Sequence, residues 1–284
     1  MPISRGECKY NMTSIPPSFG LKIRRDVIDP GTGIPEGGTR DCASGFTLME
    51  LLVVIAIILV MMALAAPAFH AIKGGGDVTK AAYDVSGAIA VARSYAMANN
   101  TYAWLGFFEE DPTQSSGTAG TGRVVMSIVS SKDGTSIYSS VSSPAVALDP
   151  TRLSQVSKLI KVENAHLVTF PDGDGTGTAF DTRPAAGSAT ARIGDTTPPN
   201  ASLTPFQYPV ASASPVPAAQ YNFTKVLQFS PRGEVRVNNI NYTMKPVVEV
   251  GLQPTHGTAI DAASKNVAAI QVTGIAGNVT IYRR

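Results

Sequence analysis

The chain has 284 residues, a length that accommodates one large domain or two small ones. Its 23 Lys and Arg residues nearly balance its 21 Asp and Glu residues, so no overall field favours binding to nucleic acid or to acidic substrates. Charged residues make up only 15% of the chain while small residues and proline are abundant, a composition more typical of exported β-rich proteins than of cytosolic enzymes.

The first part of the chain, residues 1–45, contains no pattern that predicts a folded domain. It is rich in Pro and Gly and lacks the periodicity of a helix or a strand, so we expect a disordered leader that is removed. Both cysteines of the chain, Cys8 and Cys42, lie in this leader. Its removal would leave a mature chain without disulfide or thiolate–metal chemistry.

A long apolar segment follows at residues 46–69, and Glu50 is its only ionisable residue. A helix of about 24 residues rises roughly 36 Å, somewhat more than the hydrocarbon core of a bilayer of about 30 Å. Basic residues lie upstream, at residues 22–25, and the positive-inside tendency therefore places the N-terminus in the cytoplasm and exports the rest. We predict a single transmembrane anchor helix over residues 46–73.

The start of this segment, GFTLMELLVV at residues 45–54, resembles the processing signature of type IV prepilins and type II secretion pseudopilins. The resemblance implies that a prepilin peptidase cuts after Gly45 and that the new N-terminal residue, Phe46, is N-methylated. It also implies that Glu50 serves subunit assembly by pairing with the N-terminal ammonium of a neighbouring subunit, so that two charges neutralise each other in an apolar bundle. Pro67 falls where pilins commonly carry a helix-bending proline.

Two other kinds of segment share this apolar length, a secretory signal peptide and a plain transmembrane anchor. Ala63 and Ala65 resemble the small residues of a signal-peptidase site. An acidic side chain costs on the order of 3 kcal/mol at the centre of an inserted helix, so Glu50 needs a partner that a secretory signal does not supply. The carboxylate therefore favours the prepilin-type signal.

Next along the chain, Gly74–Gly76 are expected to interrupt the helix and separate an anchor from a head, because each glycine costs about 1 kcal/mol relative to alanine. Asp77 can then cap a second helix at about residues 77–99, whose apolar residues recur at spacings of four and three. This stripe predicts that the helix packs on a sheet. It consists of Val78, Ala82, Val85, Ile89, Ala92 and Ala96.

The remainder, residues 101–284, shows the patterns of short strands and tight turns. Period-two alternation and a turn at Pro231-Arg232-Gly233 predict an antiparallel β-rich head over residues 74–284. The fold class is therefore α+β: a long N-terminal helix with a transmembrane half and an amphipathic half, packed on an antiparallel sheet as in pilins. We expect strands at residues 102–108, 123–130, 167–170, 226–229, 234–237, 247–252, 268–273 and 279–282.

The order of these elements resembles that of the minor pseudopilin H and FimT-like group, as do the segments at residues 91–96 and 229–233. The largest insert, at about residues 171–222, is rich in Pro and Gly and is expected to be an exposed loop.

Within this insert Asp172, Asp174 and Thr176 place oxygen atoms at alternate positions, as part of a calcium-binding loop does. The twelfth position is Arg183 rather than a glutamate, so a plain Asp/Gly turn is the alternative that we favour. No other cofactor is expected.

No group of residues indicates catalysis. His70, His166 and His256 are scattered, and the sequence has no phosphate-binding glycine loop, nucleophile elbow or metalloprotease helix. Trp104 with Phe107 and its aromatic neighbours could form a stacking platform for single-stranded DNA, but alternate strand residues packed in a core explain them better. We therefore expect neither an enzyme nor a nucleic-acid partner.

The resulting hypothesis is a structural subunit of a bacterial type II secretion or type IV pilus filament. It would be held in the inner membrane by a single span, with its C-terminal head in the periplasm. Its expected partners are the prepilin peptidase, other pilin or pseudopilin subunits, the inner-membrane assembly platform and the lipid bilayer. The competing hypothesis is a membrane-tethered β domain whose long loop binds a surface ligand, a polysaccharide or DNA.

Overall fold

The computed structural model of the chain describes residues 47–136, 148–194, 205–210, 218–237 and 244–284, without the side chains of residues 65–76 and 189. The expected leader and the residues of the expected cleavage site, Gly45 and Phe46, lie outside the described residues. The backbone of Pro67 is helical, and its predicted role in bending the helix stays a prediction.

Helix α1 (Leu48–Ala98) contains 51 residues. Its backbone is helical through Gly74–Gly76, so the predicted interruption of the helix at the three glycines is wrong. A penalty of about 1 kcal/mol per glycine weakens a helix locally but does not forbid helical dihedral angles. The two predicted helices are therefore two halves of one element.

The C-terminus of α1 is closed by an asparagine in the left-handed conformation. Asn100 has a φ of 47°, its N–H donates to the carbonyl oxygen of Met97, and the N–H of Thr101 donates to that of Ala96 at 3.0 Å. These two hydrogen bonds form a Schellman motif, which satisfies the last carbonyl groups of the helix and turns the chain into the sheet.

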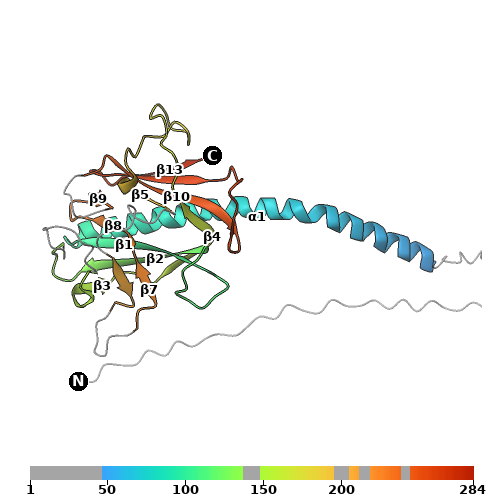
Figure 1. Ribbon diagram of the computed structural model, residues 1–284, viewed down its shortest axis with the longest axis horizontal. Coiled ribbons are helices and arrows are strands. Elements are labelled where there is room, and N and C mark those ends of the chain that lie inside the picture. Colours follow the sequence, from blue (N-terminus) through green and yellow to red (C-terminus); the bar gives the residue numbers. More distant parts are fainter. Residues whose placement is uncertain (1–46, 137–147, 195–204, 211–217, 238–243) are drawn as a thin grey trace, which may run out of the picture. The chain divides into compact units, whose positions relative to one another are not determined.

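The described strands form one 11-stranded sheet and one 2-stranded sheet (Figure 1). The path of the large sheet is β13-β12-β10-β4-β2-β1-β8-β9, while β3, β5 and β11 pair at its sides. The pairings are antiparallel except that of β5 with β10. This architecture confirms the α+β class. The bounds are β1 (Ala103–Glu110), β2 (Gly122–Ser131), β3 (Leu153–Gln155), β4 (Ile160–Val168), β5 (Arg192–Ile193), β6 (Phe206–Tyr208), β7 (Tyr221–Phe223), β8 (Lys225–Phe229), β9 (Val235–Arg236), β10 (Val247–His256), β11 (Ala259–Ile260), β12 (Ala268–Thr273) and β13 (Val279–Arg283), with short 3-10 helices at Pro150–Arg152 and Ala189–Ala191.

Each of the eight predicted strands overlaps an observed strand. The predicted turn at Pro231-Arg232-Gly233 joins β8 to β9, where Gly233 has a φ of 83° and its N–H donates to the carbonyl oxygen of Ser230.

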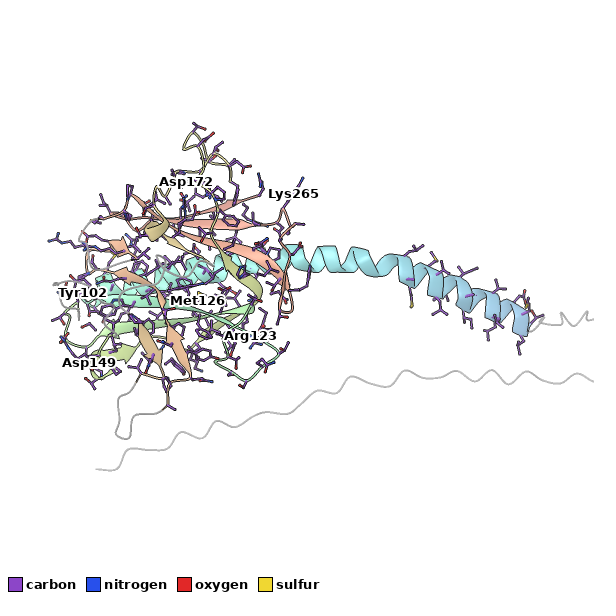
Figure 2. The ribbon with its side chains drawn as sticks, viewed as in Figure 1. Tyr102, Arg123, Met126, Asp149, Asp172 and Lys265 are labelled. Carbon is purple, nitrogen blue, oxygen red and sulfur yellow. The ribbon has the colours of Figure 1, made fainter. Side chains whose placement is uncertain are left out.

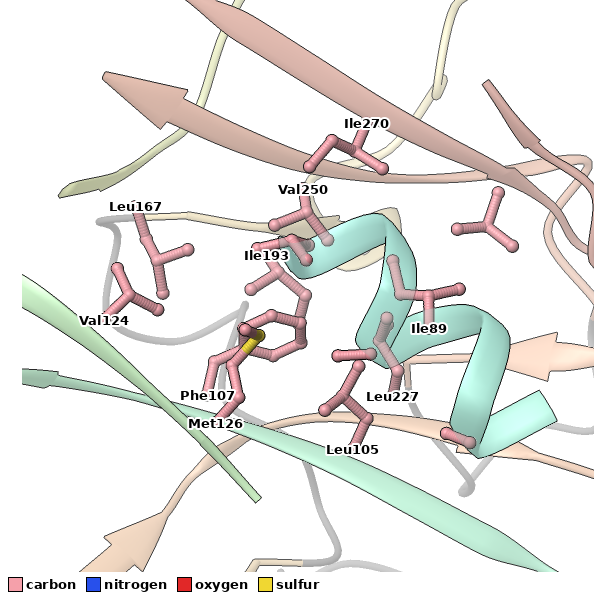
Figure 3. Packing of buried hydrophobic residues seen from close by; sticks show 14 of the residues in the cluster. Ile89, Leu105, Phe107, Val124, Met126, Leu167, Ile193, Leu227, Val250 and Ile270 are labelled. Carbon is pink, nitrogen blue, oxygen red and sulfur yellow. The ribbon is translucent and has the colours of Figure 1, made fainter. Parts of the chain in front are cut away.

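The main core lies between the C-terminal half of α1 and one face of the large sheet. All six residues of the predicted stripe are buried there, which confirms the amphipathic pattern. Figure 3 shows Ile89 of α1 close to Leu105 and Leu227 from the strands. The other face of β1 and β2 carries a second core, which contains Trp104, Phe206 and Phe223.

The large sheet curves around α1 until its two ends touch. The N–H of Val235, in the terminal strand β9, donates to the carbonyl oxygen of Gly274 after β12 at 2.8 Å. A Cβ added to Gly277 would collide with Gly233 and with Arg93 of α1. Arg93 Nε also donates to the carbonyl oxygen of Gly233 at 3.4 Å, so the fold brings together the two segments at residues 91–96 and 229–233.

The insert at residues 171–222 is an exposed loop only in part: residues 174–179 are exposed, but the prediction is wrong for the segments that pack on the sheet. It contributes β5, β6 and β7 and buries large side chains, among them Phe180, Phe206 and Tyr221. The β6–β7 hairpin packs directly on β1, where a Cβ added to Gly106 would lie 2.6 Å from Cβ of Phe223. Short strands tolerate a Pro-rich neighbourhood when aromatic burial fixes them.

Candidate processing and assembly site

The first turn of α1 is closed by a reciprocal pair of side chains, Thr47 and Glu50. The backbone N–H and the hydroxyl of Thr47 both donate to Glu50 Oε2, at 3.0 and 2.9 Å. The N–H of Glu50 donates in return to the Thr47 hydroxyl at 3.2 Å. This geometry is a capping box, which satisfies N–H groups that have no partner within the helix.

Sequence analysis missed Thr47, although a threonine three residues before a glutamate at the start of an apolar run is a recognised signal. The capping box holds the Glu50 carboxylate against the helix terminus through one oxygen. Among the described residues, no group donates to Oε1 of Glu50. Oε1 of Glu50 is therefore able to pair with a cationic group that lies outside the described residues.

The N-terminal half of α1 carries a continuous apolar surface. Every large apolar side chain between Leu48 and Leu64 is exposed, from 44% at Val54 to 81% at Leu48. Burial of one such side chain contributes about 1.5–3 kcal/mol, so this surface favours an apolar environment strongly. By contrast, no helix within the described residues has a stretch both long and apolar enough to cross a membrane.

The candidate calcium ligands are engaged by groups of the chain itself. Asp174 Oδ1 accepts hydrogen bonds from the N–H and the hydroxyl of Thr176, at 3.0 and 2.7 Å, which is the geometry of an Asp turn. Asp172, which is labelled in Figure 2, accepts at Oδ1 from the N–H of Ala186 at 2.8 Å and from the Arg192 guanidinium. Burial alone would raise the pKa of Asp172, but the hydrogen bond from Arg192 lowers it below its ordinary value.

Within the described part of the chain, no group of three or more His, Cys, Asp or Glu side chains could hold a metal ion. The positive charge buried within this loop belongs to a side chain, the guanidinium of Arg183. Arg183 forms a bidentate pair with Glu249 of β10, at 2.7 and 3.1 Å, and donates to the carbonyl oxygens of Phe180 and Pro171. This contact fixes the loop to the sheet.

One end of β1 carries two adjacent carboxylates on opposite faces, of which Glu109 is half-buried and Glu110 is fully buried. Glu109 is hydrogen-bonded to His166 Nδ1 at 2.6 Å and pairs with Lys225 at 3.0 Å. Burial alone would raise the pKa of Glu109, but the hydrogen bond with His166 and the charge of Lys225 lower it. His166 therefore belongs to a structural ion network. His256 is exposed on β10, and the side chain of His70 is not described.

Glu110 accepts hydrogen bonds from the N–H of Gly117 at 2.8 Å, from Arg123 at 3.0 Å and from the hydroxyl of Tyr221 at 3.0 Å (Figure 2 labels Arg123). Burial opposes ionisation of Glu110, but these donors outweigh it and lower its pKa. Both carboxylates thus connect β1 to neighbouring elements.

The aromatic residues at the start of β1 do not form an exposed platform. Trp104 and Phe107 are fully buried on opposite faces of the strand, in the two cores. Their packing confirms the interpretation of these residues as alternate core positions.

Comparison with known proteins adds one match. Residues 40–66 match the family model of the prokaryotic N-terminal methylation motif. The match spans Gly45, Phe46 and Glu50, and it supports a type IV pilin-like subunit that is processed by a prepilin peptidase and assembles with other pilin subunits. No curated protein and no solved structure matches the chain significantly, so the resemblance of the head to the minor pseudopilin H and FimT-like group is not confirmed.

Proposed function

We propose that this chain is a structural subunit, cut after Gly45, N-methylated at Phe46 and assembled through α1 into a filament of a type II secretion or type IV pilus system. The observation that carries the proposal is the methylation motif at residues 40–66, which leads directly into a helix whose apolar side chains are exposed as far as Leu64. Such a surface is satisfied by lipid before assembly and by other helices in a filament.

The proposed topology is a single span of the inner membrane with the C-terminal head in the periplasm. The apolar sequence continues to Phe69, and the basic residues lie on the N-terminal side of it. The partners would be the prepilin peptidase, other pilin or pseudopilin subunits, the inner-membrane assembly platform and the lipid bilayer.

Glu50 would neutralise the N-terminal ammonium of a neighbouring subunit. The capping box supports this role, because Thr47 fixes one carboxylate oxygen and the other remains able to accept a cation. An uncompensated charge in an apolar bundle is costly, whereas a paired one is tolerated. Glu50 would therefore affect assembly more than membrane insertion.

Catalysis is assigned to the partners of this protein. Pilin-like subunits are typically not enzymes, and the buried His166 and carboxylates of the head are used in ion networks. The rival hypothesis of a ligand-binding β domain relied on a long exposed loop. The large side chains Phe180, Phe206 and Tyr221 of that loop are packed in the cores of the head, and no observation favours the rival.

Cleavage tests the proposal directly. Coexpression with an active prepilin peptidase should give a mature chain that begins at N-methylated Phe46, as shown by intact mass and N-terminal sequencing. A chain that begins after Ala65, or one that stays uncut beside an active peptidase, would refute it.

Assembly tests the role of Glu50. Glu50→Val should be cleaved and inserted normally but should enter filaments poorly, while Glu50→Asp should enter them at an intermediate level. The measurement is cross-linking of subunits in cells with matched membrane levels. Wild-type incorporation of the valine variant would show that Glu50 is not the pairing group.

A further inference from the structure

Asn164 has an unusual backbone conformation in the middle of β4. Its φ is 56°, a value that non-glycine residues rarely adopt. Among them, asparagine and aspartate adopt it most readily. The register explains it: Glu163 pairs with Arg123 and Ala165 pairs with Gly122, so Asn164 is the extra residue of a β-bulge. Bulges re-aim side chains, which raises the question of what this one reaches.

The bulge directs the Asn164 amide to the start of the packed half of α1. Its Nδ2 donates to Asp77 Oδ2 at 2.8 Å, across a separation of 87 residues in sequence. A hydrogen bond to a carboxylate in a partly buried position is stronger than one between neutral groups. The contact therefore has the strength to hold a helix turn in place.

The strand is fixed on both sides of the bulge. On one side Glu163 pairs with Arg123 in the ladder with β2, and on the other side Ala165 pairs with Gly122 and is fully buried in the main core. The bulge cannot shift without breaking one of these contacts. Asn164 is thus a rigid donor.

Asp77 lies directly before the first buried residues of the packed half of α1. The apolar side chains of α1 are exposed from Leu48 to Leu64, whereas Val78, Ala81 and Ala82 are buried against the sheet. We infer that Asn164 is a clamp, a side chain that fixes the point at which α1 leaves the head. The consequence for assembly rests on the proposed function: tension on the N-terminal half of α1 would reach the sheet through this contact.

The clamp is tested by amide hydrogen exchange of the full 284-residue chain in detergent micelles, whether or not it is cleaved. Asn164→Gly keeps the backbone conformation and removes the amide, while Asn164→Asp places a carboxylate against Asp77. Both variants should raise exchange of the amides at residues 78–85 about tenfold and leave exchange in β10 and β12 unchanged. Asp84→Asn is the matched control, because it removes the charge of the exposed pair with Lys80 on the same helix and should change exchange at residues 78–85 by no more than about twofold.

The double variant Asp77→Asn with Asn164→Asp swaps the two side chains and so restores an amide opposite a carboxylate. In this double variant, the rate of amide hydrogen exchange at residues 78–85 should return to within about threefold of the wild-type rate. Loss of packing alone would not give such a rescue. The clamp is refuted if Asn164→Gly leaves the amide exchange rate at residues 78–85 unchanged, or if the rate rises equally in β10 and β12. It is also refuted if the double variant does not restore the wild-type rate. These readouts need no filament, so they are separate from a failure of cleavage or incorporation.

Discussion

The buried pair of Arg183 and Glu249 offers the sharpest test of how the insert is held on the sheet. Their side chains are 2% and 3% exposed, and the two hydrogen bonds between them are 2.7 and 3.1 Å long. Glu249→Gln keeps the shape but leaves the guanidinium without a counter-charge. Removal of one partner from a buried pair costs about 3–5 kcal/mol. We expect a loss near 3 kcal/mol, because the carbonyl oxygens of Phe180 and Pro171 still accept from Arg183.

The double variant Arg183→Met with Glu249→Met separates the charge from the packing. Replacement of both partners by apolar residues is often neutral, so the double variant should be more stable than Glu249→Gln. Together with the single variants Arg183→Met and Glu249→Met, the double variant gives the coupling energy of the pair. The exposed pair of Lys80 and Asp84 is the control, and Asp84→Asn should cost less than about 0.5 kcal/mol.

Trp104 provides the assay. It is the sole tryptophan of the chain and is fully buried in the second core, so its fluorescence reports unfolding of the head. Urea unfolding of the full chain in a mild detergent gives the midpoint and the slope for each variant. A Glu249→Gln protein within about 1 kcal/mol of the wild type would refute the reasoning, as would an equal loss in the double variant.

Three further predictions use the same assay. Gly87→Ala should raise the free energy of unfolding by about 0.5–1 kcal/mol, because Gly87 is exposed within α1 and an added Cβ meets no atom within 4 Å; a loss of stability would contradict it. The pKa of Glu110 is lower in the folded protein than its ordinary value of 4.5, so its ion network stabilises the head above that pH and this contribution is lost as the pH falls through the folded pKa. Glu110→Gln should therefore be less stable than the wild type at pH 7 and lose less stability between pH 5 and pH 3; equal losses in the two proteins would show that Glu110 is not responsible. A fragment that begins at Asp77 should unfold cooperatively without detergent, since the buried stripe begins at Val78, and aggregation of this fragment would contradict the proposed division between anchor and head.

Local periodicity explains what could be predicted of the fold. The stripe from Val78 to Ala96 repeats with the period of a helix, and the strands alternate with a period of two, so both signals lie within a few consecutive residues. The continuity of α1 through Gly74–Gly76 could not be predicted in this way, because glycine weakens a helix without forbidding helical dihedral angles.

Pairing between distant residues explains what could not be predicted. The strands β6 and β7 have only three residues each, and they exist because Phe223 packs against the bare backbone of Gly106. In the sequence, Arg183 indicates only that the twelfth position of a calcium loop lacks its glutamate. Its partner Glu249 lies 66 positions further on and could not be predicted from local sequence. Asn164 is likewise an ordinary residue until the register of β4 against β2 makes it a bulge. Thr47 differs, because its capping box with Glu50 has a local signal, a threonine three residues before a glutamate.

Because one helix serves both the head and the proposed filament, the face on which a substitution falls decides how its effect must be interpreted. Ile89 is fully buried among the strands, and its replacement by alanine would cost about 2–5 kcal/mol of head stability, so a loss of filaments in such a variant would say nothing about assembly contacts. Tyr83 lies on the same half of α1 but is 67% exposed, and a change there leaves the core intact. Defects caused by substitutions at exposed positions such as Tyr83 or Leu51 can therefore be assigned to contacts outside the subunit, provided that the Trp104 unfolding curve is unchanged.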